Sequence, residues 1–395
     1  MRIAIDLIAA EYQPGGLLLV TRTLLHGLAT IDSQNEYVVM TVRPDDYQDV
    51  AKAPNIRIHP VTLPSHRGTL MQHQLIAPIA LQQIRPDVLH VPAFAAPLSW
   101  RGALVTTIHD LAFMKVPEQS SLYARLYHMH LQRIGAQRVQ RVIVISKQSE
   151  EELTHYWSIP SQRIRLIHHA IQPSFNTHEL VPRAIADMRS RYGGRYLLHT
   201  GRIMPRKNVE CLIEAFGLLA EDFADLHLVL TGGLGYASNK AVQLIEASPY
   251  KDRIHLAGWV PTEDMPALYA GATALVFPSK HEGQGMPTLE AMACGTPVVA
   301  SYEAASIEIA GNALIRADCS CAQPLADAIV PVLTNHELRQ QCIQEGIKQA
   351  QKFRIEECVE NTLQTYQEAF ELYKHYKRLR RLGNKQDLRE GAKRA

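Results

Sequence analysis

Residues 281–300 read His-Glu-Gly-Gln-Gly-Met-Pro-Thr-Leu-Glu-Ala-Met-Ala-Cys-Gly-Thr-Pro-Val-Val-Ala. The segment follows a strand-like apolar run, residues 274–279, and its glycines permit backbone angles that let a ligand approach the main chain closely. Pro287 suits a first helical position, and Gly295 suits the residue just after a helix end. The pattern therefore predicts a strand, a glycine-rich loop and a short helix over 287–294.

Two carboxylates, Glu282 and Glu290, stand eight residues apart across this loop. Free amides and the dipole at a helix start attract phosphate, and carboxylates accept hydrogen bonds from vicinal hydroxyls. The arrangement suits a sugar nucleotide. The alternative is an ordinary strand, loop and helix with a capping glutamate, and the second carboxylate together with the sequence that follows makes it the weaker interpretation.

The segment resembles the nucleotide-binding motif of the family-4 retaining glycosyltransferases, which have the GT-B fold. The resemblance implies that Glu282 approaches the hydroxyls of the donor sugar and that Glu290 holds the nucleotide ribose. It adds four loop residues to the donor-binding set: Gly283, Gln284, Gly285 and Met286. Gln284 and Met286 stand where the family usually has Phe and Leu, which bears on donor preference and loop packing.

A second segment, residues 200–208, reads Thr-Gly-Arg-Ile-Met-Pro-Arg-Lys-Asn between a strand-like run and a helical one. Cations beside free helix amides are suited to a diphosphate, and they oppose the helix dipole if their role is only structural. The segment resembles the family's Gly-x-x-x-Pro-Arg-Lys-Asn motif, whose basic residues neutralise the donor diphosphate. We expect Lys207 to carry this role, assisted by Arg202 or Arg206.

His109 ends an apolar strand-like run in the sequence Thr-Ile-His-Asp-Leu. A lone histidine at such a place is more often a packed or surface residue than a catalyst. This pattern is similar to the family's His-Asp-Leu element, and the resemblance implies that His109 contacts the donor sugar near the reacting centre. His168 and His169, near the middle of the chain, are interpreted as linker residues.

Gly15 and Gly16 follow the first strand-like run and precede a helical run from about Leu18 to Leu28. Their amides are expected to approach phosphate or acceptor, which places Gly16 in the donor-binding set. Relatives often carry Gly-x-x-Arg-Tyr here, whereas residues 17–20 of this chain are apolar. The acceptor side therefore departs most from the family pattern.

Strand-like and helical runs alternate along the chain, which favours parallel sheets covered by helices. The strand-like runs are 2–9, 37–42, 56–63, 88–92, 104–108, 142–146 and 164–167, and then 196–200, 226–231, 254–256, 274–278 and 297–300. Helices are expected over 209–219 and 265–270. The chain is thus predicted to form two doubly wound, Rossmann-like α/β halves joined through residues 172–182, with ligands bound beyond the carboxyl ends of the strands.

We expect an acceptor-side domain over 1–175 and a nucleotide-sugar-binding domain over 176–355, facing across a cleft as in the GT-B fold. The last helical run, 356–376, repeats apolar residues at spacings of three and four. In the resembling enzymes a terminal helix of this kind packs back on the first domain. Residues 377–395 are then a basic tail.

The composition is that of an ordinary globular protein, with 46% hydrophobic and 20% charged residues among 395. No apolar run reaches the roughly 18 residues of a spanning helix, and the amino terminus lacks a signal-peptide pattern, so we expect a cytoplasmic protein. Six cysteines without paired CxxC spacing favour reduced thiols and no metal site. No cofactor is implied.

The net charge of +2 is unevenly spread, because nine Lys or Arg and two acidic residues lie from Lys374 to the end. The composition favours a solvated, partly disordered end. The alternative is a peripheral contact with anionic lipid at the inner membrane face. Nucleic acid is not an expected partner, because no aromatic or motif pattern supports it.

The motifs together predict a metal-independent enzyme that transfers a hexosyl unit from a nucleotide diphosphate sugar to a hydroxyl of a glycan or lipid-linked acceptor. The pattern around His109 resembles mannosyl transferases of surface polysaccharide assembly, which makes a mannosyl unit the first candidate. Two alternatives stay open. A GT-B epimerase would act on a sugar nucleotide without an acceptor, and a catalytically silent binding subunit would explain Gln284 and the altered loop at Gly15.

Overall fold

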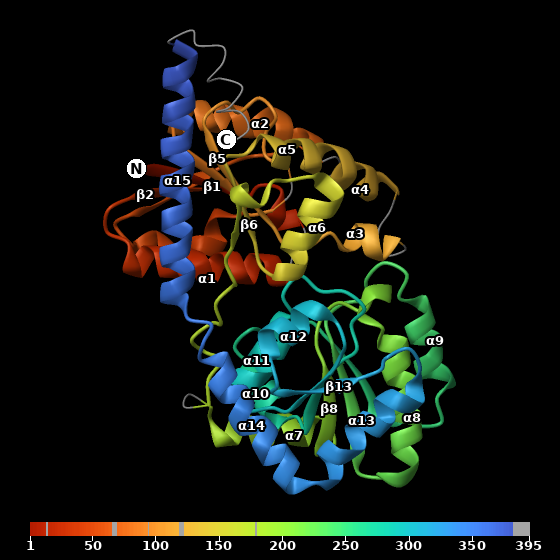
Figure 1. The fold of residues 1–395 in the computed structure, drawn as a ribbon. Helices are drawn as coiled ribbons and strands as arrows, with labels where there is room; N and C mark the ends of the chain where they lie inside the picture. Colours follow the sequence, from red (N-terminus) through yellow and green to blue (C-terminus); the bar gives the residue numbers. More distant parts are fainter. Residues whose placement is uncertain (13–14, 65–68, 94, 118–121, 178–179, 382–395) are drawn as a thin grey trace. The chain divides into compact units, whose positions relative to one another are not determined.

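The computed structural model describes residues 1–12, 15–64, 69–93, 95–117, 122–177 and 180–381, which form two compact units (Figure 1). Unit 1 contains the described parts of 1–111 and 122–170 and residues 354–381. Unit 2 contains residues 112–117 and the described parts of 171–353. The sequence placed the division after residue 175, and the contacts place it after Ala170.

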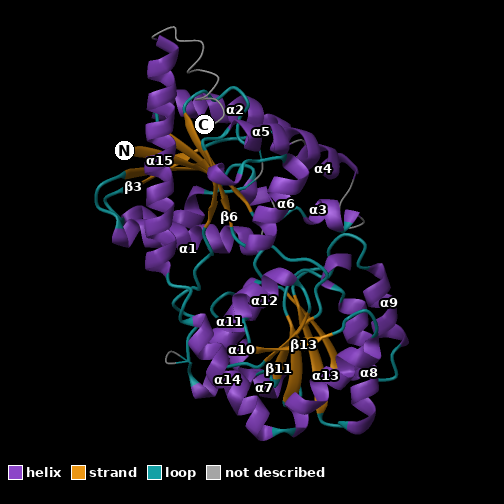
Figure 2. Ribbon diagram, viewed as in Figure 1, coloured by secondary structure: helices purple, strands orange, loops and turns teal. Residues whose placement is uncertain are grey.

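Unit 1 is built on a sheet of strands with helices packed around it (Figure 2). The sheet is parallel, with the strand order β3-β2-β1-β4-β5-β6-β7. The strands are β1 (Arg2–Asp6), β2 (Glu36–Thr41), β3 (Ile56–Pro60), β4 (Val88–Val91), β5 (Ala103–Ile108), β6 (Arg141–Val144) and β7 (Ile164–Leu166). Its helices are α1 (Gly16–Ile31), α2 (Thr69–Ile84), α4 (Leu122–Tyr127), α5 (Arg133–Arg138), α6 (Lys147–Trp157) and α15 (Ile355–Arg381). The strand order changes direction between β1 and β4.

Helix α15 packs against α1 and the sheet of unit 1, although it is the last helix that the structure describes along the chain. Gly27 of α1 makes this approach possible, because a Cβ there would lie 2.6 Å from Cγ2 of Val359 on α15. Val359, Tyr366 and Ala369 of α15 are fully buried in the core that contains Ile3 and Ile5 of β1. A 27-residue terminal helix thereby becomes part of the first unit.

Unit 2 is built on a second parallel sheet with the order β10-β9-β8-β11-β12-β13. The strands are β8 (Arg195–His199), β9 (Leu226–Thr231), β10 (Ile254–Gly258), β11 (Ala274–Phe277), β12 (Val298–Ser301) and β13 (Leu314–Ala317). Its helices include α3 (Ala112–Lys115), α7 (Pro182–Arg191), α8 (Val209–Asp222), α9 (Asn239–Ala247), α10 (Met265–Gly271), α11 (Met286–Ala293), α12 (Ala304–Ala310), α13 (Ala322–Thr334) and α14 (His336–Ala350). Two apolar clusters hold the helices to the sheet, one with α8 and α13 and one with α10 and α11.

Every strand predicted from the sequence is present, and the boundaries differ for local reasons. The first strand ends at Asp6 instead of Ala9, because the Asp6 carboxylate accepts the Ile8 amide at 3.2 Å and turns the chain. Strand β3 ends at Pro60 instead of Leu63. The sequence missed β13, a four-residue strand that pairs only with β12 among the described strands.

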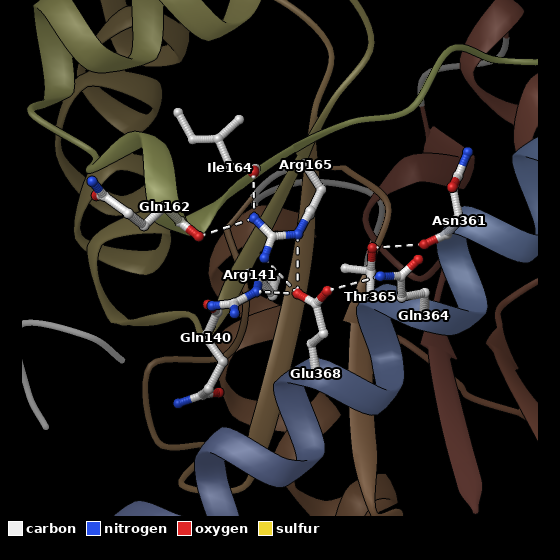
Figure 3. Close-up of polar contacts among 9 residues, drawn as sticks. All are labelled: Gln140, Arg141, Gln162, Ile164, Arg165, Asn361, Gln364, Thr365 and Glu368. Atoms are coloured by element: carbon white, nitrogen blue, oxygen red, sulfur yellow. Dashed lines mark hydrogen bonds and ion pairs between the residues drawn. The ribbon is translucent and has the colours of Figure 1, made fainter.

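Glu368 ties α15 to two strands of unit 1 (Figure 3). Its Oε2 accepts hydrogen bonds from Nε of Arg141 on β6 at 2.7 Å and from Nη2 of Arg165 on β7 at 2.6 Å. Burial raises the pKa of this carboxyl, but the hydrogen bonds from both arginines outweigh burial, so the pKa is below its ordinary value of 4.5. The bridge joins segments about two hundred residues apart in sequence.

Replacing Glu368 with glutamine is expected to destabilise unit 1 by about 1–2 kcal/mol at pH 7, because two guanidinium groups lose their charged acceptor. The lowered pKa means that the stabilisation is present above pH 4.5 and fades as the pH falls below it. Urea unfolding of the full chain at pH 7 and pH 4 measures the difference. Glu371→Gln on the same helix is the matched control, since Glu371 bonds only exposed Lys374 and the Gln367 amide among the described residues, both at the surface. Equal losses in both variants would contradict the role of the bridge.

Among the helices that the structure describes, none has both the length and the apolar composition needed to cross a bilayer.

Candidate functional site

The strand order of unit 2 brings two predicted motifs to one edge of the sheet. Strands β8 and β11 are neighbours, and the order changes direction between them. The basic segment 200–208 follows β8, and the glycine-rich segment 281–290 follows β11. Parallel strands end at the same edge, where such sheets hold ligands. The two motifs therefore meet at the switch point of this sheet.

Lys207, Arg206 and Glu282 form a compact charged cluster at this point. The Lys207 ammonium lies 2.7 Å from Oε1 of Glu282, and Nη1 of Arg206 lies 3.0 Å from the same oxygen. Lys207 and Glu282 are about 95% buried. Because two cations share one carboxylate, the cluster carries one positive charge in excess.

The strand and loop around Lys207 fix where its ammonium lies. A 3-10 turn at Pro205–Lys207 places the side chain inward, and Nζ lies 4.5 Å from the centre of the Phe277 ring on β11. Burial raises the pKa of the Glu282 carboxyl, but the nearby Arg206 and Lys207 charges prevail and lower the pKa to about 2. Glu282 is therefore a carboxylate at neutral pH, and it can accept hydrogen bonds without first losing a proton.

Glu303 supports the loop that carries Glu282. Its Oε1 accepts the backbone N–H of Glu282 at 3.1 Å, and its Oε2 accepts the N–H of Ser306 at 2.8 Å, which caps α12. Burial, together with the charge of Glu282, raises the pKa of Glu303, although hydrogen bonds from backbone amides oppose the rise. One buried carboxylate thus joins the loop after β11 to the helix after β12.

Glu290 lies in the fifth position of the eight-residue helix α11, and a tyrosine holds it. The Tyr269 hydroxyl donates to Oε2 of Glu290 at 2.6 Å and lies 3.0 Å from the hydroxyl of Thr200. Burial raises the pKa of Glu290, while the Tyr269 hydrogen bond and the Lys207 charge oppose the rise. Its side chain is oriented by Tyr269 of α10.

Glycines allow two close approaches at this edge. Gly285 adopts φ +79°, and a Cβ there would lie 3.0 Å from Oγ of Ser306. Gly232 adopts φ +95°, and a Cβ there would meet the Gly201 carbonyl oxygen at 2.5 Å. Arg202 follows Gly201 on this segment, and its side chain is exposed. Gly283 and Gln284 are buried, and Met286 is half-buried at the start of α11.

His109 and Gly16, the remaining predicted site residues, belong to unit 1. Gly16 begins α1 and is exposed, with open space where a Cβ would stand. Nε2 of His109 lies 2.8 Å from the Pro92 carbonyl oxygen, and Nδ1 lies 3.2 Å from Nε2 of His169. Since a carbonyl only accepts, we assign the proton to Nε2 of His109, and Nδ1 then accepts from His169.

The contact between His109 and His169 was not expected from the sequence. Burial lowers the pKa of both imidazoles, so both are neutral at pH 7. His169, interpreted from the sequence as a linker residue, also contacts His109, and their ring centres are 5.1 Å apart. It lies next to the division after Ala170, so the contact adds to that interpretation. A linker position gives no signal of such a contact, because it depends on β5 and the chain after β7 ending at the same edge.

Two further residues of this site, Tyr269 and Glu303, escaped the sequence analysis. A tyrosine within a short apolar helix is ordinary core composition. Glu303 carries a weak signal, since an acidic residue three positions before Ser306 suits a helix cap. Within the described ranges, no three His, Cys, Asp or Glu side chains are grouped as a metal site requires.

Comparison with known proteins shows the family of the chain. The family model described as glycosyl transferases group 1 matches residues 184–349, and the model described as glycosyltransferase family 4 matches residues 14–175. O-antigen chain mannosyltransferase B of Escherichia coli is 30% identical over 294 residues, which cover 73% of this chain and 76% of that protein. The chain belongs to the group 1 glycosyltransferases.

The solved structures place this glycosyltransferase in a known architecture. WaaG, a glycosyltransferase involved in lipopolysaccharide biosynthesis, is 18% identical with a TM-score of 0.74, over 92% of this chain and 99% of that one. Anabaena Alr3699/HepE in complex with UDP-glucose is 18% identical with a TM-score of 0.72, over 92% and 99%. The predicted GT-B fold of the glycosyltransferase is confirmed.

Proposed function

We propose that this glycosyltransferase moves a hexosyl unit, with mannose as the first candidate, from a nucleotide diphosphate sugar to an acceptor hydroxyl, with retention of configuration. The observation that carries the proposal is the buried cluster of Lys207, Arg206 and Glu282 at the switch point of unit 2. Its excess positive charge suits the diphosphate of such a donor, and its carboxylate suits the hydroxyls of the sugar.

The activities and ligands of similar proteins support a nucleotide sugar donor, mannose as the first sugar to test, and a role in surface polysaccharide assembly. The similar E. coli protein is an O-antigen chain mannosyltransferase, and HepE was solved with UDP-glucose. We propose by this likeness that the acceptor is a glycan or a lipid-linked glycan of surface polysaccharide or glycolipid assembly. The proposed working place is the cytoplasm, with the inner membrane face as the place of a lipid-linked acceptor.

The proposed mechanism uses fixed charges. Lys207 and Arg206 stabilise the negative charge that develops on the leaving diphosphate, and Arg202 is the exposed third cation of the segment. Glu282 accepts a hydroxyl of the sugar, and Glu290, oriented by Tyr269, accepts the ribose hydroxyls. Amides at the start of α11, with residues 283–286, approach the phosphates.

The same proposal assigns roles in unit 1. His109 is held by Pro92 and His169 in one tautomer and contacts the sugar, and the amide of Gly16 serves the phosphate or the acceptor. These groups orient the substrates and exclude water, which limits hydrolysis of the donor.

A screen of nucleotide sugars tests the function, with GDP-mannose first and UDP-hexoses next. We expect slow nucleotide release from one donor alone, faster release when a phosphate-bearing lipid acceptor is added, and equal rates in EDTA. Consumption of the donor without nucleotide release would instead indicate an epimerase. Binding without turnover of any donor would indicate a silent subunit. The anomeric configuration of the product, read by NMR, tests retention.

A further inference from the structure

A cavity of about 670 Å³ lies at the amino-terminal edge of the sheet of unit 1. Residues just before β5, β6 and β7 line it, together with the last turns of α15. Parallel strands have their carboxyl ends at the opposite edge, where His109 lies. The cavity is therefore separate from the proposed donor site and does not depend on the proposed function.

The lining of this cavity is strongly cationic. Five basic side chains contribute to it: Arg101, Arg138, Arg163, Lys377 and Arg380. No aspartate or glutamate lines the cavity, and within the described part of the chain no ion pair reaches any of the five cations. A basic cluster without counter-charge attracts an anion.

The arginines are held in place by neutral groups. Arg138 donates to the Leu98 carbonyl at 2.6 Å, Arg101 donates to the same carbonyl at 2.8 Å, and Arg163 donates to the Gln137 carbonyl at 2.9 Å. These bonds fix the guanidinium groups and leave their charges unbalanced. Among the described residues, Nε of Arg163 is buried without a hydrogen-bond partner, and such a donor calls for a bound acceptor.

Aromatic side chains complete the cavity. Trp100 lines it from the loop before β5, and Tyr373 and Tyr376 line it from α15. Lys377 lies 5.7 Å from the ring centre of Tyr373, which orients the ammonium. The volume falls in the range of small-molecule sites and exceeds what a simple ion fills.

We propose that this cavity, at Arg101, Arg138, Arg163, Lys377 and Arg380, binds a phosphate-bearing ligand. Arginine and lysine together suit phosphate, since guanidinium groups form paired hydrogen bonds and the ammonium supplies a point charge. The ligand has two sources, the headgroup of an anionic phospholipid or a soluble phosphate compound.

Exposed apolar residues favour the lipid source. Leu75 and Ile79 on α2 are 73% and 58% exposed, and Ile134 on α5 is 45% exposed beside Gly135 of the cavity lining. Helix α2 is tied to the cavity loop, because the Gln74 side chain bonds the backbone at Ala95, Ala96 and Leu98. Exposed apolar side chains on the helix that holds the cavity loop and on the helix that lines the cavity suit contact with the acyl part of a membrane surface. Lys377 and Arg380, which the sequence analysis placed in the basic tail, belong to α15 in the structure, and the tail from residue 382 on lies outside the described residues.

The test compares two charge-reversed forms of the full chain. Lys377→Glu with Arg380→Glu changes the cavity, and Lys374→Glu with Arg378→Glu makes the same charge change on the same helix outside the lining. One arm measures co-sedimentation with phosphatidylcholine vesicles with and without phosphatidylglycerol. The other arm measures binding of inorganic pyrophosphate by calorimetry. Both forms change exposed residues, and circular dichroism checks that they fold.

We expect the cavity form to bind at least about tenfold more weakly than wild type and the control form to lose less than about threefold. If the cavity form loses binding only to the anionic vesicles, the ligand is a lipid headgroup. If wild type does not bind vesicles and the cavity form loses binding to pyrophosphate, the ligand is a soluble phosphate compound. A third form, Arg101→Glu, must repeat the result from the loop side of the cavity. Equal behaviour of the cavity and control forms, or no binding by wild type in either arm, would overturn the proposal.

Discussion

Replacing Lys207 with alanine is expected to lower kcat/KM for the donor by about 10²–10³-fold, because a preset charge next to the leaving group is removed. Lys207 is buried, so its ammonium acts where the effective dielectric constant is low and a charge has a larger effect than in water. The loss should lie mostly in kcat, since charge develops on the diphosphate in the transition state. Initial rates of nucleotide release over a range of donor concentrations measure it.

The matched control for Lys207 is Lys280, which lies in the loop after β11. Lys280 is exposed, and its backbone N–H donates to the Arg206 carbonyl at 2.8 Å, so Lys280→Ala keeps that bond and removes only a surface charge. We expect Lys280→Ala to change kcat/KM by less than about threefold. If a folded Lys207→Ala variant keeps the wild-type rate, Lys207 does not act on the donor and the proposed role is contradicted.

The fold was readable from the sequence because its signals are local and repeated. Strands of parallel sheets are buried on both faces, so runs such as 274–277 are apolar throughout and stand out between helices. Strand β13 has an exposed residue, Arg316, and only four residues, so its pattern is weak. The α15 helix was readable as amphipathic, whereas its place on unit 1 came from resemblance.

The charged part of the site was readable for a different reason. Lys207 and Glu282 each lie in a motif with its own glycine and proline signals, and the sheet order then brings the motifs together. Tyr269, Glu303 and His169 were not readable, because their roles come from single contacts between distant segments. Such contacts leave no periodicity in the sequence, and they decide how the site side chains are oriented.

Replacing Glu282 with glutamine is expected to destabilise the protein by about 3 kcal/mol at pH 7, because Lys207 and Arg206 lose their shared buried carboxylate. The pKa of Glu282 falls from 4.5 to about 2 in the folded state. A lowered carboxyl pKa stabilises the fold above the unfolded value, and this contribution is lost as the pH falls from about 4.5 toward 2. The gap in unfolding free energy between wild type and the variant should therefore narrow below pH 4.5. Urea unfolding between pH 7 and pH 3 measures it, with exposed Glu263→Gln as the control.

The same variant is expected to lose about 10²-fold in kcat/KM, and a substrate change separates a contact with the sugar from a merely structural effect. If Glu282 accepts a donor hydroxyl, wild type should lose activity with the donor analogue that lacks that hydroxyl. The activity of Glu282→Gln should then be nearly the same with this analogue as with the complete donor. A set of deoxy sugars covers each hydroxyl in turn. Losses that simply add for every analogue would mean that Glu282 holds Lys207 and Arg206 in place without touching the sugar, since two changes that share no contact act independently.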